Sequence, residues 1–278
     1  MTFLTRSLIV VMAAATLTAC QSRRISESSV YVEREVEAIY AAAVERLDDR
    51  RWSDAADQFD EVERQHPYSE WARRAMLMAA YANYQAGNYD EAISDAERFI
   101  ALHPGNRSAP YAYYLVAISH YEQIIDVGRD QQATVSALNA LQQVVRRYPE
   151  SRYAQDARLK IDMTRDHLAG KEMAIGRWYL RRGFYLAGIN RFRNVLENFE
   201  TTTHTPEALH RVVESYVALG IDEEATQVAA VLGHNFPGSN WYEDTYRLLT
   251  EEGIAIPNPD LQPENPSYWQ RAMDRLFG

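Results

Sequence analysis

Cys20 is the residue whose type and position most clearly indicate covalent chemistry. It is the only cysteine among 278 residues, so its thiol has no partner for an intramolecular disulfide. Arg6 precedes an apolar run over residues 8–19 that is too short to cross a bilayer as a stable helix. A positive start, a short apolar run and a small final residue, Ala19, predict a cleavable secretory signal over residues 1–19. The alternative is a buried free cysteine, but a core cysteine has no reason to close a signal segment.

The ending Leu17-Thr18-Ala19-Cys20 resembles the lipobox of bacterial lipoproteins. The resemblance implies that the signal is cut before Cys20 and that the cysteine carries acyl chains on its thiol and on its new amino group. Each buried methylene contributes about 0.8 kcal/mol, so several chains on one residue hold a folded body on a membrane. No other apolar run approaches the roughly 20 residues of a membrane helix. The covalent lipid on Cys20 is therefore the expected anchor, and no other cofactor is expected.

An arginine cluster in the second half of the chain is a candidate for binding carboxylates. The chain as a whole is acidic, with a formal net charge of −10, which argues against nucleic acid as a partner. Because the planar guanidinium matches a carboxylate, the cluster predicts a docking site for an acidic protein surface. Ordinary surface charge on a helix is the alternative. The cluster consists of Arg177, Arg181, Arg182, Arg191 and Arg193.

Catalytic and metal-binding motifs are not found in the sequence. It contains no glycine-rich phosphate loop, no His-Glu-x-x-His, no Cys-x-x-Cys and no nucleophile elbow. His66 and His103 each precede a proline at the same place in a repeat, which favours a role in a turn over metal binding. The sequence therefore predicts a protein without catalytic or metal-binding residues rather than an enzyme.

Helical segments that can be superposed recur along the chain, and they must position these residues. They begin at Val36, Arg73, Pro110, Ala169 and Pro206. A small residue falls at position 8 of four units, with Val213 as the bulkier exception, and at position 20 of all five, where two antiparallel helices can then approach closely. Larger apolar residues recur at position 27, and prolines 67, 104, 149 and 237 close the units. The pattern resembles the tetratricopeptide repeat and predicts an all-α, right-handed α-solenoid of five such repeats.

Two departures from the period predict additional structure. The third unit needs an eight-residue shift, which places an insert around residues 124–134. The fourth unit starts late, and the extra residues keep helical spacing without a proline. We therefore expect one long bridging helix from about Tyr153 to Arg182, before repeat 4.

A groove for an extended peptide is expected along the first helices of repeats two and three. In this repeat class, positions 2, 5, 9, 12 and 13 of the first helix line the concave groove. Tyrosine combines wide apolar contact with a polar tip, a composition suited to gripping a peptide. The alternative is that half of these tyrosines only pack between hairpins. The expected groove residues are Arg74, Leu77, Tyr81, Tyr84, Gln85, Tyr111, Tyr114, Ile118 and Tyr121.

The combination of lipobox, five repeats, insert and long fourth helix is similar to the BamD family of outer-membrane lipoproteins. Shared stretches include His66-Pro67-Tyr68-Ser69, Arg129-Asp130-Gln131, Arg147-Tyr148-Pro149-Glu150-Ser151-Arg152-Tyr153-Ala154 and Ile189-Asn190-Arg191-Phe192. The resemblance implies a scaffold of the outer-membrane β-barrel assembly machine that is lipid-anchored in the outer membrane and faces the periplasm. Its implied partners are the periplasmic domains of the central barrel subunit, other lipoproteins of the machine, and unfolded outer-membrane protein precursors. A periplasmic repeat lipoprotein that organises cell-wall synthesis or division is the alternative.

The expected organisation follows from the repeats and the tail. A signal peptide over 1–19 and a linker over 20–30 precede repeats one to three with the start of the bridging helix over 31–168. Repeats four and five with a capping helix follow over 169–252. A proline-rich linker and a short amphipathic C-terminal helix occupy 253–278, and this helix either packs on the last repeat or grips another subunit. Its apolar face would comprise Tyr268, Trp269, Ala272, Met273, Leu276 and Phe277.

Overall fold

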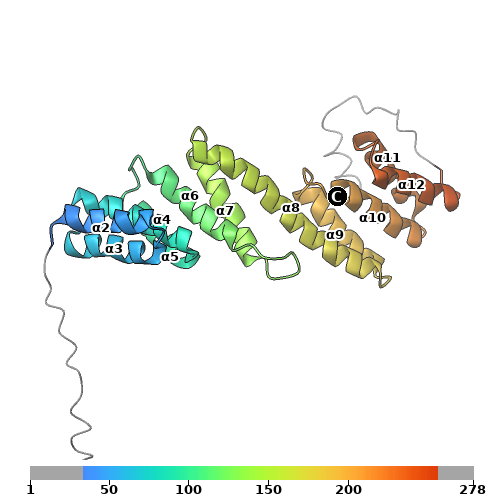
Figure 1. Ribbon diagram of the computed structural model, residues 1–278. Helices are drawn as coiled ribbons and strands as arrows, with labels where there is room; N and C mark the ends of the chain where they lie inside the picture. Colours follow the sequence, from blue (N-terminus) through green and yellow to red (C-terminus); the bar gives the residue numbers. More distant parts are fainter. Residues whose placement is uncertain (1–33, 256–278) are drawn as a thin grey trace, which may run out of the picture.

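Eleven α-helices form residues 34–255, the part of the chain that this computed structural model describes (Figure 1). Ten of them make five hairpins, and no strand occurs among these residues. The hairpins are α2 (Val36–Asp48) with α3 (Trp52–Gln65), α4 (Glu70–Ala86) with α5 (Tyr89–Leu102), α6 (Ala109–Glu122) with α7 (Gln132–Arg147), α8 (Arg152–Leu180) with α9 (Tyr185–Asn198), and α10 (Thr205–Ala218) with α11 (Asp222–Asn235). A last helix, α12 (Asn240–Glu251), covers the end. The predicted all-α solenoid of five repeats is confirmed.

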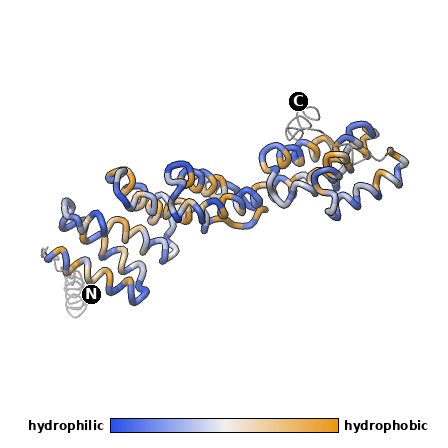
Figure 2. The backbone as a smooth tube through the Cα atoms, turned by 90° about the horizontal axis from the view of Figure 1, so that it is seen from above, coloured by the Kyte–Doolittle hydropathy of each residue, from blue (hydrophilic) through white to orange (hydrophobic). Residues whose placement is uncertain are grey.

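Each helix packs on the next one in sequence, and the first helix of each hairpin also packs on the first helix of the following hairpin. The result is an elongated stack (Figure 1). Figure 2 shows apolar segments spread along the whole length rather than gathered at one place. The core is accordingly divided: one cluster of buried residues joins α8 to α12, and separate clusters lie under the earlier hairpins.

The repeat register read from the sequence matches the packing of the hairpins. All five residues at position 8 are buried, and so are all five at position 20. The larger residues at position 27 are buried too: Val62, Phe99, Val144, Val195 and Leu232. Because a small side chain faces each crossing point, the paired helices approach closely enough to bury their apolar faces.

Turn chemistry fixes where the helices begin and end. Ser69, Ser151 and Ser239 cap α4, α8 and α12, each accepting a hydrogen bond from the backbone amide three residues later. Within the hairpins, Gly87 and Gly220 have φ of 81° and 71° at the turns between the two helices. A left-handed backbone is cheapest for glycine, so these residues stop the first helix and allow the chain to reverse.

The long bridging helix is confirmed, since α8 runs without interruption from Arg152 to Leu180. The insert between α6 and α7 lies against it. The ammonium of Lys171 donates hydrogen bonds to the carbonyl oxygens of Gly128 at 3.0 Å and Arg129 at 3.3 Å. The insert therefore ties the third repeat to the middle of α8.

The capping helix α12 is held by a buried polar contact. Nδ1 of His210 in α10 lies 2.8 Å from the hydroxyl of Thr245, and its ring stacks on Trp241 at 5.4 Å between centroids. Burial, reinforced by the charge of Arg211, lowers the pKa of His210. The imidazole is therefore neutral at neutral pH, as a buried hydrogen-bonded ring should be.

The lipidation residue Cys20, the signal peptide and the predicted C-terminal helix lie outside the described residues. Within residues 34–255, none of the helices combines the length and the apolar character needed to cross a membrane.

Candidate binding surfaces

A row of half-buried tyrosines crosses the first helices of repeats two and three, where the groove was predicted. We call Tyr81, Tyr84, Tyr111, Tyr114 and Tyr121 the tyrosine stripe. The first two lie on α4 and the other three on α6, and each ring is partly covered and partly open to solvent. Of the other predicted groove residues, Arg74 and Gln85 are exposed, Leu77 is partly covered and Ile118 is buried.

Carboxylates hold the hydroxyl groups of two stripe tyrosines. The Tyr114 hydroxyl donates to Asp156 at 2.5 Å, and the Tyr84 hydroxyl lies 3.4 Å from Glu122. Burial, with the negative charge of Glu122 adding to it, raises the pKa of Tyr84 to about 12. Burial, followed by the hydrogen bond to Asp156, raises the pKa of Tyr114 further. These tyrosines therefore stay neutral and fixed in orientation, with their ring faces left for contact.

The start of the bridging helix supplies a third row that sequence reasoning missed. The ring of Tyr153 lies 5.4 Å from that of Tyr111 and 5.2 Å from that of Tyr114. Lys160 lies 5.3 Å over the ring of Tyr121. The sequence carried a signal for this row, namely residues spaced for one face of a helix: Tyr153, Asp156, Lys160 and Met163. We interpreted the segment only as a spacer and did not assign this face to the groove.

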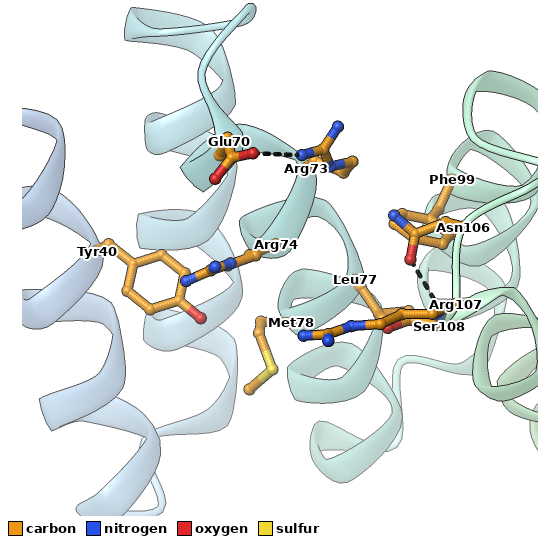
Figure 3. A pocket seen from close by; sticks show the side chains of 10 residues that line it. All are labelled: Tyr40, Glu70, Arg73, Arg74, Leu77, Met78, Phe99, Asn106, Arg107 and Ser108. Atoms are coloured by element: carbon orange, nitrogen blue, oxygen red, sulfur yellow. Dashed lines mark hydrogen bonds and ion pairs between the residues drawn. The ribbon is translucent and has the colours of Figure 1, made fainter.

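A pocket of about 510 Å³ lies at the N-terminal end of the stripe, between α2, α4 and the loop before α6 (Figure 3). We call it the N-terminal pocket. Tyr40, Leu77, Met78 and Phe99 give it apolar walls. Three arginines also line the pocket: Arg73, Arg74 and Arg107. Within residues 34–255, Arg73 is the only one of the three that forms an ion pair, with Glu70 at 3.3 Å. The combination suits an apolar side chain next to a carboxylate or carbonyl oxygen.

The predicted arginine cluster is divided by internal ion pairs. Arg177 donates two hydrogen bonds to Glu207 of α10, at 2.9 and 3.0 Å. Arg191 lies 3.1 Å from Glu172 of α8, and Arg193 lies 2.6 Å from Glu197 of its own helix. Arg181 and Arg182 are exposed at the turn between α8 and α9. A docking role for these residues stays a prediction.

Exposed apolar side chains surround that turn and were not predicted. Trp178, Phe184 and Leu186 are 42%, 56% and 65% exposed, and Arg182 stacks over Trp178 at 4.2 Å. We call these residues together with Arg181 the turn patch. Their signal in the sequence is a set of large apolar residues next to Gly183, which marks a turn rather than a helix interior. Tryptophan and arginine together are typical of the energetic centre of protein interfaces.

Within residues 34–255, no three His, Cys, Asp or Glu side chains are grouped so that they could hold a metal ion. The surfaces that carry chemistry are the tyrosine stripe, the N-terminal pocket and the turn patch.

Comparison with known proteins identifies the family to which this chain belongs. The family described as YfiO, outer membrane lipoprotein, matches residues 32–232. The outer membrane protein assembly factor BamD of Caulobacter vibrioides is 54% identical over 267 residues, which cover 96% of this chain and 87% of that protein. The protein of the same name from Rickettsia prowazekii is 43% identical over 230 residues, covering 83% and 90%. Among solved structures, a thermophilic TPR protein of Thermus thermophilus aligns with a TM-score of 0.36 and 16% identity over 80% of this chain and 100% of that chain. This chain belongs to the family of outer membrane lipoproteins that includes the BamD proteins.

Proposed function

We propose that this protein is an assembly factor of the outer membrane: a scaffold that takes part in the assembly and insertion of β-barrel proteins. The observation that carries the proposal is the family match, which spans the tyrosine stripe, the N-terminal pocket and the turn patch. Two relatives that cover most of this chain bear the name outer membrane protein assembly factor. A stacked solenoid suits this role because it presents an extended binding surface without needing a closed active site.

The tyrosine stripe and the N-terminal pocket would receive segments of unfolded barrel precursors. Helices pack about 8–10 Å apart, so the rows on α4, α6 and α8 span about 20 Å, the length of about six residues of extended chain. Because the hydroxyls of Tyr84 and Tyr114 already donate to carboxylates, the ring faces are the contact surface. Aromatic and β-branched side chains of a precursor strand would pack on them, and the arginines would hold carboxylate or carbonyl oxygens.

The C-terminal repeats would dock on the central barrel subunit through its periplasmic domains. The turn patch offers apolar contact from Trp178 and Phe184 together with the positive charge of Arg181. A partner surface with an apolar centre and an acidic rim would complement it. The other lipoproteins of the machine remain further partners implied by the family.

A binding measurement with a defined peptide tests the role of the stripe. The probe is a fluorescent peptide with the sequence of the last transmembrane strand of an outer-membrane barrel protein. We expect Tyr81→Ala/Tyr111→Ala and Arg74→Glu each to weaken binding at least tenfold, and Tyr114→Phe, which keeps the ring, to leave binding within about threefold. Tyr246→Ala is the matched control, because Tyr246 is a half-exposed tyrosine on α12, far from the stripe. Equal affinity for all variants would remove the stripe as the substrate site.

A depletion experiment separates the proposal from a role in cell-wall synthesis or division. Loss of the protein should lower the amount of β-barrel proteins in the outer membrane before septation changes. Septation defects that come first, with barrel proteins at normal levels, would favour the alternative.

Anchoring by lipid on Cys20 is tested in the same cells. The variant Cys20→Ala should lose labelling with a radioactive fatty acid and appear either uncleaved or in the periplasmic fraction. Normal labelling of that variant would overturn the assignment of Cys20.

A further inference from the structure

A groove of about 380 Å³ opens between α5 and α7, at the junction of the second and third repeats. Its floor comes from α6, where Val116 and Tyr113 face the groove. Tyr113 and Val116 each lie two residues from a stripe tyrosine, which turns them by about 200° around α6. The groove therefore lies on a different side of the solenoid from the tyrosine stripe.

The same place is bridged by ion pairs at the junction of the first and second repeats. Arg98 of α5 reaches across to α3, where it lies 2.8 Å from Glu63 and 3.9 Å from Asp60. It also pairs with Asp95 of its own helix at 3.1 Å. The arginine side chain and its carboxylates therefore bridge the two second helices at this junction.

The repeat register explains why the bridge is missing one repeat later. Arg98 precedes the position-27 residue of its repeat, and Gln143 occupies that place in the third repeat. Glu63 follows the position-27 residue of the first repeat, and Ile100 occupies that place in the second. At the junction of the second and third repeats, the neutral amide of Gln143 therefore faces Ile100, and no ion pair can form between them. At the preceding junction, Arg98 faces Glu63 instead.

The junction of the fourth and fifth repeats is packed with apolar side chains instead. The residue at the place of Arg98 is Val231 there, and it is only 1% exposed. Leu209 and Val212, the counterparts of Tyr113 and Val116, are fully buried. The groove therefore differs from both of these junctions, one of which is bridged by ion pairs and the other packed with buried apolar side chains.

Polar groups without partners line one wall of the groove. Asn139 and Gln143 lie one turn apart on α7, and neither side-chain amide takes part in a hydrogen bond within residues 34–255. Four residues of helix rise about 6 Å, close to the roughly 6.6–6.8 Å between alternate residues of an extended chain. Each amide offers a donor and an acceptor, the two groups that an extended backbone presents.

We propose that this groove binds an extended polypeptide segment of a partner protein, with an apolar side chain over Val116 and Tyr113 and the backbone held by Asn139 and Gln143. Glu97 on the α5 wall has no ion pair within the described part of the chain and favours a basic residue in the segment. The ring of His120, whose pKa burial lowers, adds no positive charge at neutral pH. The proposal does not depend on the role of the tyrosine stripe, which lies on another side of α6.

The junction bridged by ion pairs supplies the design of a test. Gln143→Arg/Ile100→Glu recreates in the open groove the ion pair that Arg98 and Glu63 make one repeat earlier. The matched control for the added arginine is Gln142→Arg, which places the same side chain at the neighbouring exposed position of α7. Circular dichroism and the melting temperature establish that each variant is folded.

The probe is a displayed library of random dodecapeptides, selected on the mature protein in detergent, with the enriched peptides then measured by fluorescence anisotropy. We expect enriched peptides with alternating apolar residues that bind at least tenfold more weakly to the closed variant and to Asn139→Ala/Gln143→Ala. Binding should be unchanged with Gln142→Arg and with Gln132→Ala/Gln142→Ala. N-methylation of alternate backbone amides of the peptide should cost a similar loss.

Two outcomes overturn the proposal. A selection that yields no peptide able to distinguish the wild type from the closed variant shows that the groove binds no extended chain. Peptides whose affinity is lost in Tyr81→Ala/Tyr111→Ala but retained in the closed variant bind the tyrosine stripe instead.

Discussion

Arg191 of α9 lies 3.1 Å from Glu172 of α8. A residue that we predicted to dock on a partner is therefore already ion-paired within the fold. The side chain of Glu172 is only 17% exposed, whereas that of Arg191 is 42% exposed. A guanidinium held from one side by a covered carboxylate can still receive a second carboxylate from a partner. The pair joins the two helices of the fourth hairpin, so a change at Arg191 affects both docking and folding.

A charge swap separates these two effects. Arg191→Glu places two carboxylates together and should lower the free energy of unfolding by about 1 kcal/mol, since the pair is partly exposed. Glu172→Arg/Arg191→Glu restores the pair with the opposite orientation and should recover the melting temperature. We expect both variants to lose co-purification with the central barrel subunit. If the swapped variant co-purifies like the wild type, docking depends on the turn patch around Trp178 without a contribution from Arg191.

The crossing of α8 and α9 depends on Gly176 rather than on Gly188. A Cβ on Gly176 would lie 2.4 Å from the ring of Phe192, which is fully buried and cannot move aside. A Cβ on Gly188 would meet nothing closer than 3.5 Å, an ordinary contact. Although Gly188 holds the small-residue position 20 of its repeat, it therefore has room for a methyl group.

Two alanine substitutions test this difference. Gly176→Ala should destabilise the protein by about 1–3 kcal/mol through overpacking. Gly188→Ala should leave stability unchanged or raise it by up to about 1 kcal/mol, because alanine is favoured over glycine inside a helix. Urea denaturation measures both, and equal destabilisation by the two changes would contradict the packing at Phe192.

The periodic features of the fold were predictable because each repeat solves the same packing problem. Positions 8, 20 and 27 must be small or apolar wherever two helices cross, so the register followed from residue types alone. Ion pairs between repeats were not predictable, because they join residues far apart in the sequence. Arg177, for example, pairs with Glu207, thirty residues later. The tyrosine stripe was foreseen, but its third row around Tyr153 was not, because α8 was interpreted as a spacer.

The groove between α5 and α7 could not be predicted from the sequence either. Its opening depends on what the register places opposite Gln143, namely Ile100 and Glu97 of the preceding repeat. Each of these residues is unremarkable within its own helix. Only the comparison of one junction with the next reveals that an ion pair is missing.

Arg50 occupies the turn position at which three other repeats have glycine. Its φ is 59°, and Gly87, Gly183 and Gly220 have φ of 81°, 76° and 71° at the same place. A left-handed backbone costs a residue with a Cβ about 1–2 kcal/mol, and the greater freedom of glycine in the unfolded chain offsets part of this. Arg50→Gly should therefore raise stability by up to about 1 kcal/mol. Asp49→Gly is the control, since Asp49 has an ordinary φ of −74° and its change should lower stability.

Asp60 makes the stability of the first two repeats depend on pH. Burial, together with the negative charge of Asp95, raises the pKa of its carboxyl to about 6, although Arg98 acts in the opposite direction. Between about pH 4 and 6 the folded protein then holds more protons at this site than the unfolded chain does. The contribution of Asp60 to stability consequently falls as pH rises through this window. Above about pH 6, the charged carboxylate destabilises the folded state.

Removing that charge should therefore help at neutral pH and not in acid. We expect Asp60→Asn to be more stable than the wild type at pH 7.5, by less than about 1 kcal/mol because the side chain is half exposed and screened. At pH 4.5, where the wild-type carboxyl is already protonated, the difference should vanish. Urea denaturation at both pH values measures this, with Asp162→Asn, an exposed charge on α8, as the control. A variant that is less stable at pH 7.5 would mean that the attraction between Asp60 and Arg98 outweighs the burial and repulsion that raise the pKa.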